Sequence, residues 1–407
     1  MKRMYSPSRP GSHSLQKGIS LVETMIGMAL GLVASFIIVQ SFSSSEAYRR
    51  NIGGSGDAIQ TAAIAGGHLD MVLQEAGGSL VLGRHVWSCK LLVSRGSSAV
   101  IPRGSAYPDP FASFPTTIRV LPIGVMDGGT GSDVIMVMTG NSGSGNRDAP
   151  FKISGSNLSV TNSNGIGLTS VGKTPNDLFL AVPQDVPGGP GSCQIVQAQS
   201  TFAVGAAVTD PSLGLKVMPA NVVTTIPLNT ATYGLLTTMT DLDSPSIFHL
   251  GRESSPIFSL ISVNANGELV EYDLLERVNA QTFGENIFLL KVRYGLDNGN
   301  AGGVANDNVI DEWVSPGTSG WQISNLMDGT ASIEQKVDQI KAIRIAMVTR
   351  SSQAVTTDAK TTQLVLFPDL SSSLQVTRSL SSDEQKYQYQ VFDWVIPLRN
   401  MKATPKA

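Results

Sequence analysis

An uninterrupted apolar segment near the start of the chain is the strongest feature of its hydrophobic pattern. Residues 19–39 read ISLVETMIGMALGLVASFIIV, and Glu23 is the only ionisable side chain among them. As a helix this segment would span about 31 Å, which is enough to cross the hydrocarbon core of a bilayer. The pattern therefore predicts a membrane-spanning helix over residues 19–39.

A second helical pattern follows, in which apolar and small residues recur at three- and four-residue steps. This spacing is typical of a helix with one face packed on the rest of the protein. We expect the N-terminal helix to cover residues 19–80, with a weak point just outside the membrane at Gly53, Gly54 and Gly56. The residues expected on the packed face are Ile59, Ala62, Gly66, Leu69, Leu73, Ala76 and Leu80.

The remainder of the chain, residues 81–407, contains short β-branched and aromatic runs separated by Gly, Pro, Asn and Ser. Such runs predict an antiparallel sheet or sheets. One short helix is expected at residues 333–340, so the fold class is α+β. The predicted strands are 117–123, 133–139, 194–204, 257–263, 268–274, 287–294, 343–349, 363–367 and 387–396.

Charge supports a membrane orientation and argues against a nucleic-acid partner. Residues 1–18 carry four basic and no acidic side chains, so removing them changes the formal net charge from −3 to −7. A basic leader stays on the cytoplasmic side of the membrane, and the bulk of the chain is then translocated. A net negative charge disfavours binding of nucleic acid over a large part of the protein surface.

The junction between leader and helix carries a specific motif. Lys17, Gly18 and Ile19 precede Ser-Leu-Val-Glu, which places Glu23 at the fifth position after Gly18. This arrangement resembles the type IV prepilin signature. The resemblance implies that a prepilin peptidase cuts after Gly18, that Ile19 is N-methylated, and that Glu23 meets the α-amine of a neighbouring subunit. Two opposite charges in hydrocarbon compensate each other only when they are paired closely, which supports the last assignment.

Two simpler interpretations of the N-terminus are less favoured. An ordinary secretory signal peptide usually has a shorter apolar region, and the leader here is long and polar. An ordinary single-pass anchor would carry Glu23 without a role, although a charged side chain in a membrane helix costs at least about 2.5 kcal/mol.

Further landmarks narrow the resemblance to PilW-type minor pilins. They are the segments 66–78 (GGHLDMVLQEAGG), 131–140 (GSDVIMVMTG), 291–300 (KVRYGLDNGN), 340–351 (IKAIRIAMVTRS) and 394–400 (WVIPLRN). A Gly-rich helix around Gly53 and Gly66 and a long polar insert at 139–174 depart from the pattern. The resemblance implies a pilin fold, with a leader at 1–18, the helix at 19–80 and a β-rich periplasmic domain at 81–407.

The same resemblance implies a location and a set of partners. The protein would sit in the inner membrane and then join a pilus or its tip, where it helps to start the filament. Its partners would be the prepilin peptidase, other minor pilins, the major pilin and, as a further candidate, a tip adhesin. A minor pseudopilin of a type II secretion system has the same kind of N-terminal cleavage motif and helix, and is the alternative. A membrane-anchored periplasmic binding module or enzyme is an alternative of another class.

The two cysteines, Cys89 and Cys193, leave one intramolecular pairing. A membrane-anchored protein that faces an oxidising compartment is expected to form it. A loop of about 100 residues closed in this way gains at most about 4.7 kcal/mol on the chain-entropy model. Two unrelated buried thiols are the alternative.

Motifs for catalysis or cofactor binding are weak. Residues 167–174 match GxxxxGK[ST], but prolines follow where a phosphate loop would open a helix. Asp297, Asp307 and Asp311 lie in an Asx-rich segment that makes calcium conceivable, yet the spacing is not that of an EF-hand and an Asx-rich turn fits better. The four histidines lack the spacing of a helical zinc site. We therefore expect no enzyme activity, metal or cofactor.

Overall fold

The computed structural model divides the chain into two compact units, Met1–Gly53 and Gly54–Ala407. A long helix, α1, covers Leu21–Gln74 and so contributes to both. Its helical backbone continues through the glycine cluster predicted as a weak point. The structure describes residues 20–80, 86–96, 98–142, 148–161, 176–183, 191–200, 208–209, 216–217, 224–233, 245–354 and 361–403.

The second unit is built around two antiparallel sheets that share one hydrophobic core. The five-stranded sheet has the order β15-β14-β13-β4-β3, and the four-stranded sheet has the order β17-β16-β18-β21. Their strands are β3 (Ile123–Met126), β4 (Val134–Thr139), β13 (Ile257–Val263), β14 (Leu269–Asp273), β15 (Gln281–Gly284), β16 (Ile287–Leu296), β17 (Glu312–Val314), β18 (Ile340–Arg350) and β21 (Tyr389–Pro397).

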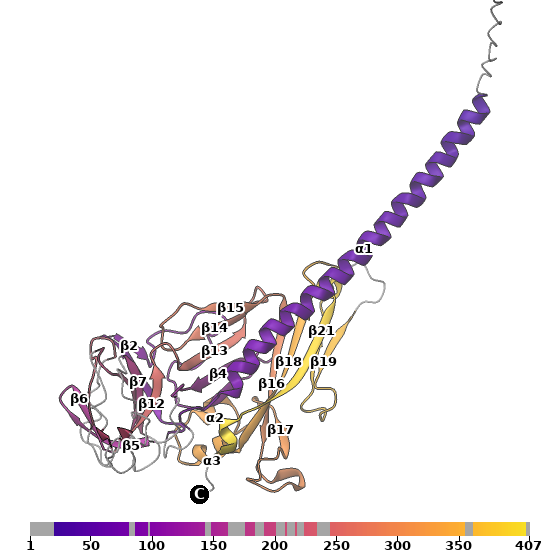
Figure 1. The fold of residues 1–407 in the computed structure, drawn as a ribbon. Coiled ribbons are helices and arrows are strands. Elements are labelled where there is room, and N and C mark those ends of the chain that lie inside the picture. Colours follow the sequence, from indigo (N-terminus) through magenta and orange to yellow (C-terminus); the bar gives the residue numbers. More distant parts are fainter. Residues whose placement is uncertain are drawn as a thin grey trace, which may run out of the picture. The chain divides into compact units, whose positions relative to one another are not determined.

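A third sheet lies at the other end of this unit from the four-stranded one, as Figure 1 shows. Eight strands form it in the order β11-β6-β5-β12-β7-β8-β1-β2 within the described residues. Most of it is inserted between β4 and β13, and it has a hydrophobic core of its own around Phe151 and Phe179. Its strands are β1 (Lys90–Arg95), β2 (Ser98–Ile101), β5 (Asp148–Ser154), β6 (Asn157–Val160), β7 (Asp177–Val182), β8 (Ser192–Gln197), β11 (Thr224–Pro227) and β12 (Ser246–Arg252).

Smaller elements complete the described structure. The helices α2 and α3 precede β18, and the hairpin β19-β20 covers part of the four-stranded sheet with a third hydrophobic cluster. A separate pair of strands, β9 and β10, is also present. The bounds are α2 (Ile323–Leu326), α3 (Ser332–Gln339), β19 (Gln363–Leu366), β20 (Val376–Ser379), β9 (Val208–Thr209) and β10 (Lys216–Val217).

The fold class is α+β, as the sequence predicts, and most predicted strands are present. The predicted strand 117–123 is wrong in its bounds: Arg119 forms only an isolated bridge to Lys90, and β3 begins at Ile123. Proline at position 122 lacks the N–H that a continuous ladder would use. The sheets are also not wholly antiparallel, because β1 and β8 pair in parallel.

Helix α1 ends at Gln74, and residues 75–80 form turns that lie against β4. Gly77 has φ +77°, and its N–H donates to the carbonyl of Met138. A Cβ at Gly78 would come 2.6 Å from Oγ1 of Thr139, so only glycine fits there. The glycine pair thus both ends the helix and lets the chain approach the sheet closely.

Candidate assembly site

The first unit contains the apolar segment of α1. Leu21–Phe42 has a mean hydropathy of 2.1, and none of its side chains is buried within the structure. By length and composition this segment can cross a membrane. Gly18 and Ile19, the predicted cleavage and methylation residues, lie outside the described residues.

Glu23 occupies the first turn of this helix. The carbonyl of Ser20 accepts hydrogen bonds from the N–H groups of Glu23 and Thr24, at 2.9 and 3.1 Å, and so begins the helix. Among the described residues, none is in hydrogen-bonding or ion-pairing contact with the Glu23 carboxylate, which is exposed. A carboxylate in the first turn is favoured by the helix dipole, but in hydrocarbon it still needs a cation.

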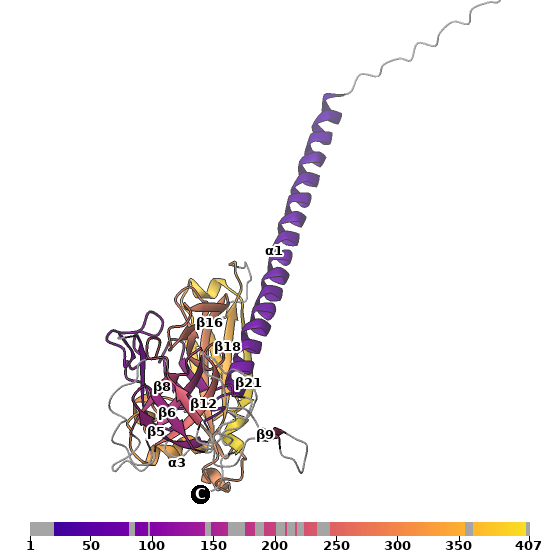
Figure 2. The same ribbon diagram turned by 60° about the vertical axis from the view of Figure 1, so that its left-hand side comes forward.

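In the second unit, the inner face of α1 packs on the sheets (Figure 2). The helix residues buried there are Ala58, Ala62, Ala65, Leu69, Val72 and Leu73. Small side chains and glycines bring the helix close to its neighbours: a Cβ at Gly284 of β15 would lie 3.0 Å from the Cβ of Ala65. A Cβ at Gly66 would lie 3.6 Å from the Trp394 ring of β21. The helix therefore contacts both the five-stranded and the four-stranded sheet.

The prediction for Ile59 is wrong. Its side chain is 52% exposed, whereas Ala58 beside it is buried. The buried positions 58, 62, 65, 69 and 72 follow one helical face, and position 59 lies next to that face. At the start of this interface the buried position is held by the small residue Ala58, so the apolar character of Ile59 does not indicate its burial.

Polar contacts also hold α1 on the sheets. Nε2 of His68 lies 2.8 Å from the Glu271 carboxylate of β14, and the His68 ring stacks on Phe283 of β15. At the end of the helix, Nδ2 of Asn400 donates to the carbonyl of Glu75 at 2.9 Å. These contacts fix which face of α1 points away from the core.

That outward face is open and mostly apolar, with Gln60 as an exposed polar side chain on it. We call it the outer helix face and define it as Gly56, Ile59, Ala63, Ile64, Gly67 and Met71, all of which are exposed. Ile64 and Met71 are 57% and 60% exposed, and a Cβ at Gly56 or Gly67 would meet nothing within 4 Å. Glycine and alanine among larger apolar side chains make a surface that another helix can approach closely.

The predicted disulfide is present. Cys89, just before β1, is joined to Cys193 of β8, with a Cα–Cα distance of 5.7 Å. Both cysteines are fully buried, and the parallel pairing of Leu91 with Cys193 holds the two strands in register. The bond therefore connects the first strand after α1 to the inserted part of the eight-stranded sheet.

The Asx-rich segment forms hydrogen-bonded turns in the structure. Asp297 accepts hydrogen bonds from the N–H groups of Asn306 and Asn308, and Asp311 accepts them from Asn298 and Gly299. These carboxylates thus bind backbone donors of their own loop. The described part of the chain contains no group of three His, Cys, Asp or Glu residues placed to hold a metal ion.

Two other sequence features stand apart from the helix. Residues 167–174, which match the phosphate-loop pattern, lie outside the described residues, as do His13 and His85. His249 of β12 meets the Asp177 carboxylate of β7 at 2.9 Å, and its ring stacks on Phe179.

Comparison with known families agrees with the sequence landmarks. The model of the family "Type IV Pilus-assembly protein W" (PilW) matches residues 260–400, from β13 to the end of β21. A search of curated proteins and one of solved structures gave no match. This part of the chain is therefore similar to type IV pilus-assembly proteins of the PilW type, in agreement with the landmarks.

Proposed function

We propose that this protein is a minor pilin, a structural subunit that helps to initiate a type IV pilus or forms part of its tip. One observation carries the proposal: the exposed apolar segment Leu21–Phe42 holds a single carboxylate, Glu23, in its first turn. A simple anchor has no use for that charge, whereas a filament subunit can pair it with the α-amine of a neighbour.

The second unit supplies independent support. Monomeric soluble domains seldom expose several large apolar side chains on one surface without a binding partner. The outer helix face exposes Ile59, Ile64 and Met71, with smaller residues and Gln60 between them. In the proposed filament this face packs against other subunits, and the β-rich unit lies on the periplasmic side of the inner membrane before assembly.

In this proposal the protein acts by contact and not by catalysis. Cleavage after Gly18 frees the amine of Ile19, which the peptidase then methylates. The family match favours the pilus over a type II secretion pseudopilus, because the matched family is defined by pilus assembly. The pilin fold follows as part of the same proposal, with α1 as its helix.

Mass spectrometry of the N-terminal peptide of the membrane-extracted protein tests the processing step. The expected species begins at methylated Ile19. The variant Gly18→Val should keep the full-length N-terminus, and Lys17→Gln serves as a control that leaves the cleavage residue intact. A wild-type protein that begins at another residue, or normal maturation of Gly18→Val, would overturn this part of the proposal.

A further inference from the structure

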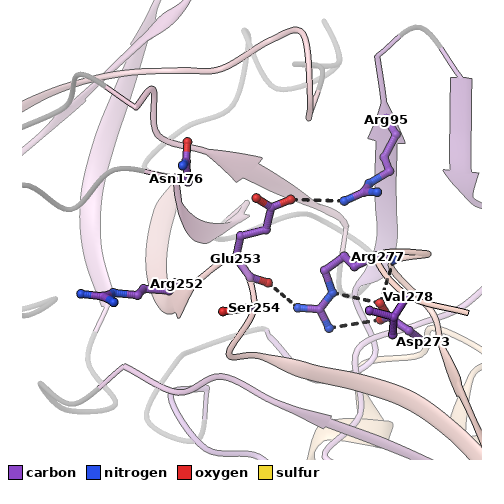
Figure 3. Close-up of a pocket in the computed structure, with 8 residues that line it drawn as sticks. All are labelled: Arg95, Asn176, Arg252, Glu253, Ser254, Asp273, Arg277 and Val278. Carbon is purple, nitrogen blue, oxygen red and sulfur yellow. Dashed lines mark hydrogen bonds and ion pairs between the residues drawn. The ribbon is translucent and has the colours of Figure 1, made fainter. Parts of the chain in front are cut away.

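A cavity of about 530 Å³ lies where the eight-stranded sheet meets the end of β14 (Figure 3). Its lining includes three arginines, but two of them are already paired, Arg95 with Glu253 and Arg277 with Asp273. The guanidinium of the third, Arg252, extends away from the other lining side chains in Figure 3. The described side chains of this cavity therefore do not converge on a ligand, in contrast to the backbone groups at the edge of β21.

Strand β21 forms one edge of the four-stranded sheet, where it pairs with β18. In an antiparallel pair, successive residues direct their N–H and C=O groups alternately toward the partner strand and away from it. The carbonyl of Gln388 accepts a hydrogen bond from the N–H of Ser351, and the N–H of Leu398 is also bonded to β18. The even-numbered residues of β21 therefore face β18. The odd-numbered residues face the free edge, and within the described part of the chain no group bonds to their outward N–H or C=O.

This edge lacks the features that usually keep an edge strand from pairing, which are short length, lysine, an internal proline or a bulge. Strand β21 has nine residues, its register with β18 is unbroken, and its one proline, Pro397, comes last. Its only charged side chain is Asp393, which accepts hydrogen bonds from Arg344 at 2.7 and 2.8 Å. The other edge strands of the three larger sheets, as far as the structure describes them, have three or four residues each: β2, β3, β11, β15 and β17.

The helix α1 runs beside β21 in the same direction (Figure 1). A Cβ at Gly66 would lie 3.6 Å from the Trp394 ring of β21. Nine residues further along α1, the carbonyl of Glu75 accepts a hydrogen bond from Asn400, which follows β21. These two contacts fix which part of the helix lies next to each part of the strand.

Apolar side chains lie on both faces of this edge. Ile59 and Ala63 follow the same stripe of α1 as Gly66, and both are exposed. Ile59 precedes Gly66 by about 10 Å of helix, which corresponds to about three residues of a strand, so it lies near the level of Val391. On the opposite face of β21, Val391 and Val395 are 43% and 44% exposed. A segment placed beside β21 would therefore meet apolar side chains on both of its own faces.

We propose that the free edge of β21 binds an extended segment of a partner protein, which adds to the four-stranded sheet as a fifth strand. A row of outward N–H and C=O groups on every second residue is matched by another backbone in the extended conformation. The apolar contacts on both faces favour β-branched side chains in that segment. This inference goes beyond the filament role and does not depend on it.

A partner strand fits this edge better than a second copy of the chain. Antiparallel pairing of two β21 strands would turn the two accompanying α1 helices in opposite directions, because each helix runs in the same direction as its own β21. The N-terminal end of α1 leads to the segment Leu21–Phe42, which can cross a membrane. Two copies paired in this way could not both direct that end toward one membrane.

Fluorescence anisotropy with the detergent-solubilised full chain and a labelled peptide, Lys-Thr-Val-Thr-Val-Thr-Val-Thr-Lys, tests the proposal. The matched control is the same peptide N-methylated at two adjacent central amides. This change removes a donor from each edge of the peptide and leaves its side chains unchanged. The unmodified peptide should bind at least tenfold more tightly than the control. Equal binding of the two peptides, or binding of neither, would overturn the proposal.

Variants of β21 locate the binding. Val391→Pro removes an outward N–H, which an edge strand tolerates, whereas Val391→Thr keeps both the N–H and the β-branched shape. Val395→Lys introduces the charge that natural edge strands use against pairing. Val391→Pro and Val395→Lys should each weaken peptide binding at least tenfold, and Val391→Thr should change it less than threefold. Val365→Lys on β19 is a further control, since Val365 is 36% exposed, and it should leave binding unchanged.

The melting temperature of each variant separates lost binding from lost folding. If Val391→Pro lowers it, Val395→Lys decides the assignment, because that substitution changes an exposed side chain and leaves the backbone intact. Wild-type affinity in Val395→Lys would overturn the assignment. Sedimentation of the chain without peptide tests the other occupant: a dimer that Val395→Lys dissociates would overturn the choice of a partner strand in favour of a second copy. None of these measurements requires a filament, so their failure is distinct from failure of the proposed function.

Discussion

Lys291 of β16 and Asp133, just before β4, form a buried ion pair with Nζ 2.6 Å from Oδ1. Their side chains are 2% and 0% exposed. Asp133 also accepts hydrogen bonds from the N–H groups of Val292 and Gly128. The pair therefore joins the five-stranded sheet to the four-stranded one. It also explains two of the PilW-type landmarks, because 131–140 contains Asp133 and 291–300 begins with Lys291.

Breaking this pair from one side should be costly. Lys291→Met leaves the Asp133 carboxylate buried without its cation, which destabilises a protein by about 3–5 kcal/mol. Denaturant unfolding of the detergent-solubilised protein measures the change. Lys291→Met combined with Asp133→Asn should be less destabilised than the single variant, because the buried charge is then absent.

Lys386 provides the matched control for this experiment. It forms an ion pair of similar length, 2.7 Å, with Asp383, but the two side chains are 57% and 86% exposed. Lys386→Met should therefore change the free energy of unfolding far less. Equal effects of the two lysine variants would contradict the role given to burial.

The outer helix face should matter for assembly and not for folding. Ile64→Glu places a charge on this face, and glutamate is a good helix former. We expect an unchanged melting temperature and loss of the protein from sheared filaments, measured by immunoblot. Val309→Glu is the control, since Val309 is equally exposed, at 59% against 57%, but lies in the Asx-rich segment. Normal incorporation of Ile64→Glu would remove this face from the interface.

Asp338 of α3 makes stability depend on pH. Burial raises the pKa of its carboxyl to about 6, Glu334 adds to this rise, and Lys341 opposes it. Because the pKa is higher in the folded state than in the unfolded state, the folded state binds the proton more tightly. Stability from this group is therefore greatest below about pH 4 and falls as the pH rises through 6.

The variant Asp338→Asn isolates this effect. At pH 7.5 it should stabilise the protein by about 1–2 kcal/mol, a value that allows for solvent screening of a partly exposed group. Near pH 4 the variant and the wild type should differ little, since the carboxyl of folded Asp338 is then protonated and carries no buried charge. Denaturant unfolding at the two pH values checks this, and a gain that is equal at both would contradict the assignment.

The sequence predicts those helices and strands whose spacing of apolar and polar residues is visible within the element itself. Strand β13 has the predicted bounds, and α3 lies within one residue of them, because alternation or helical spacing marks each one. The sequence pattern does not predict most strands of the eight-stranded sheet. Strand β7 is buried at every position, so it lacks the alternation of a half-buried strand. In β12 the ladder is irregular at Gly251, whose φ is +100°.

The assembly site, too, is predictable from the sequence only in part. Glu23 stands out from the sequence because a carboxylate in an apolar run is costly wherever the chain folds. The inner face of α1 depends on close approach to Gly284 and Trp394, which lie more than 200 residues away, and local periodicity cannot report such partners. The cavity is harder still, since Arg95, Arg252 and Asp273 meet only after three separate segments have folded.

Recovery of the variant Glu23→Leu in filaments tests the central claim most directly. The helix becomes wholly apolar, so the variant should reach the membrane fraction at the wild-type level. Without the carboxylate it cannot pair with a neighbour's α-amine, and sheared filaments should contain at least tenfold less of it than of the wild type. Equal amounts of Glu23→Leu and wild-type protein in the filament fraction would contradict the account.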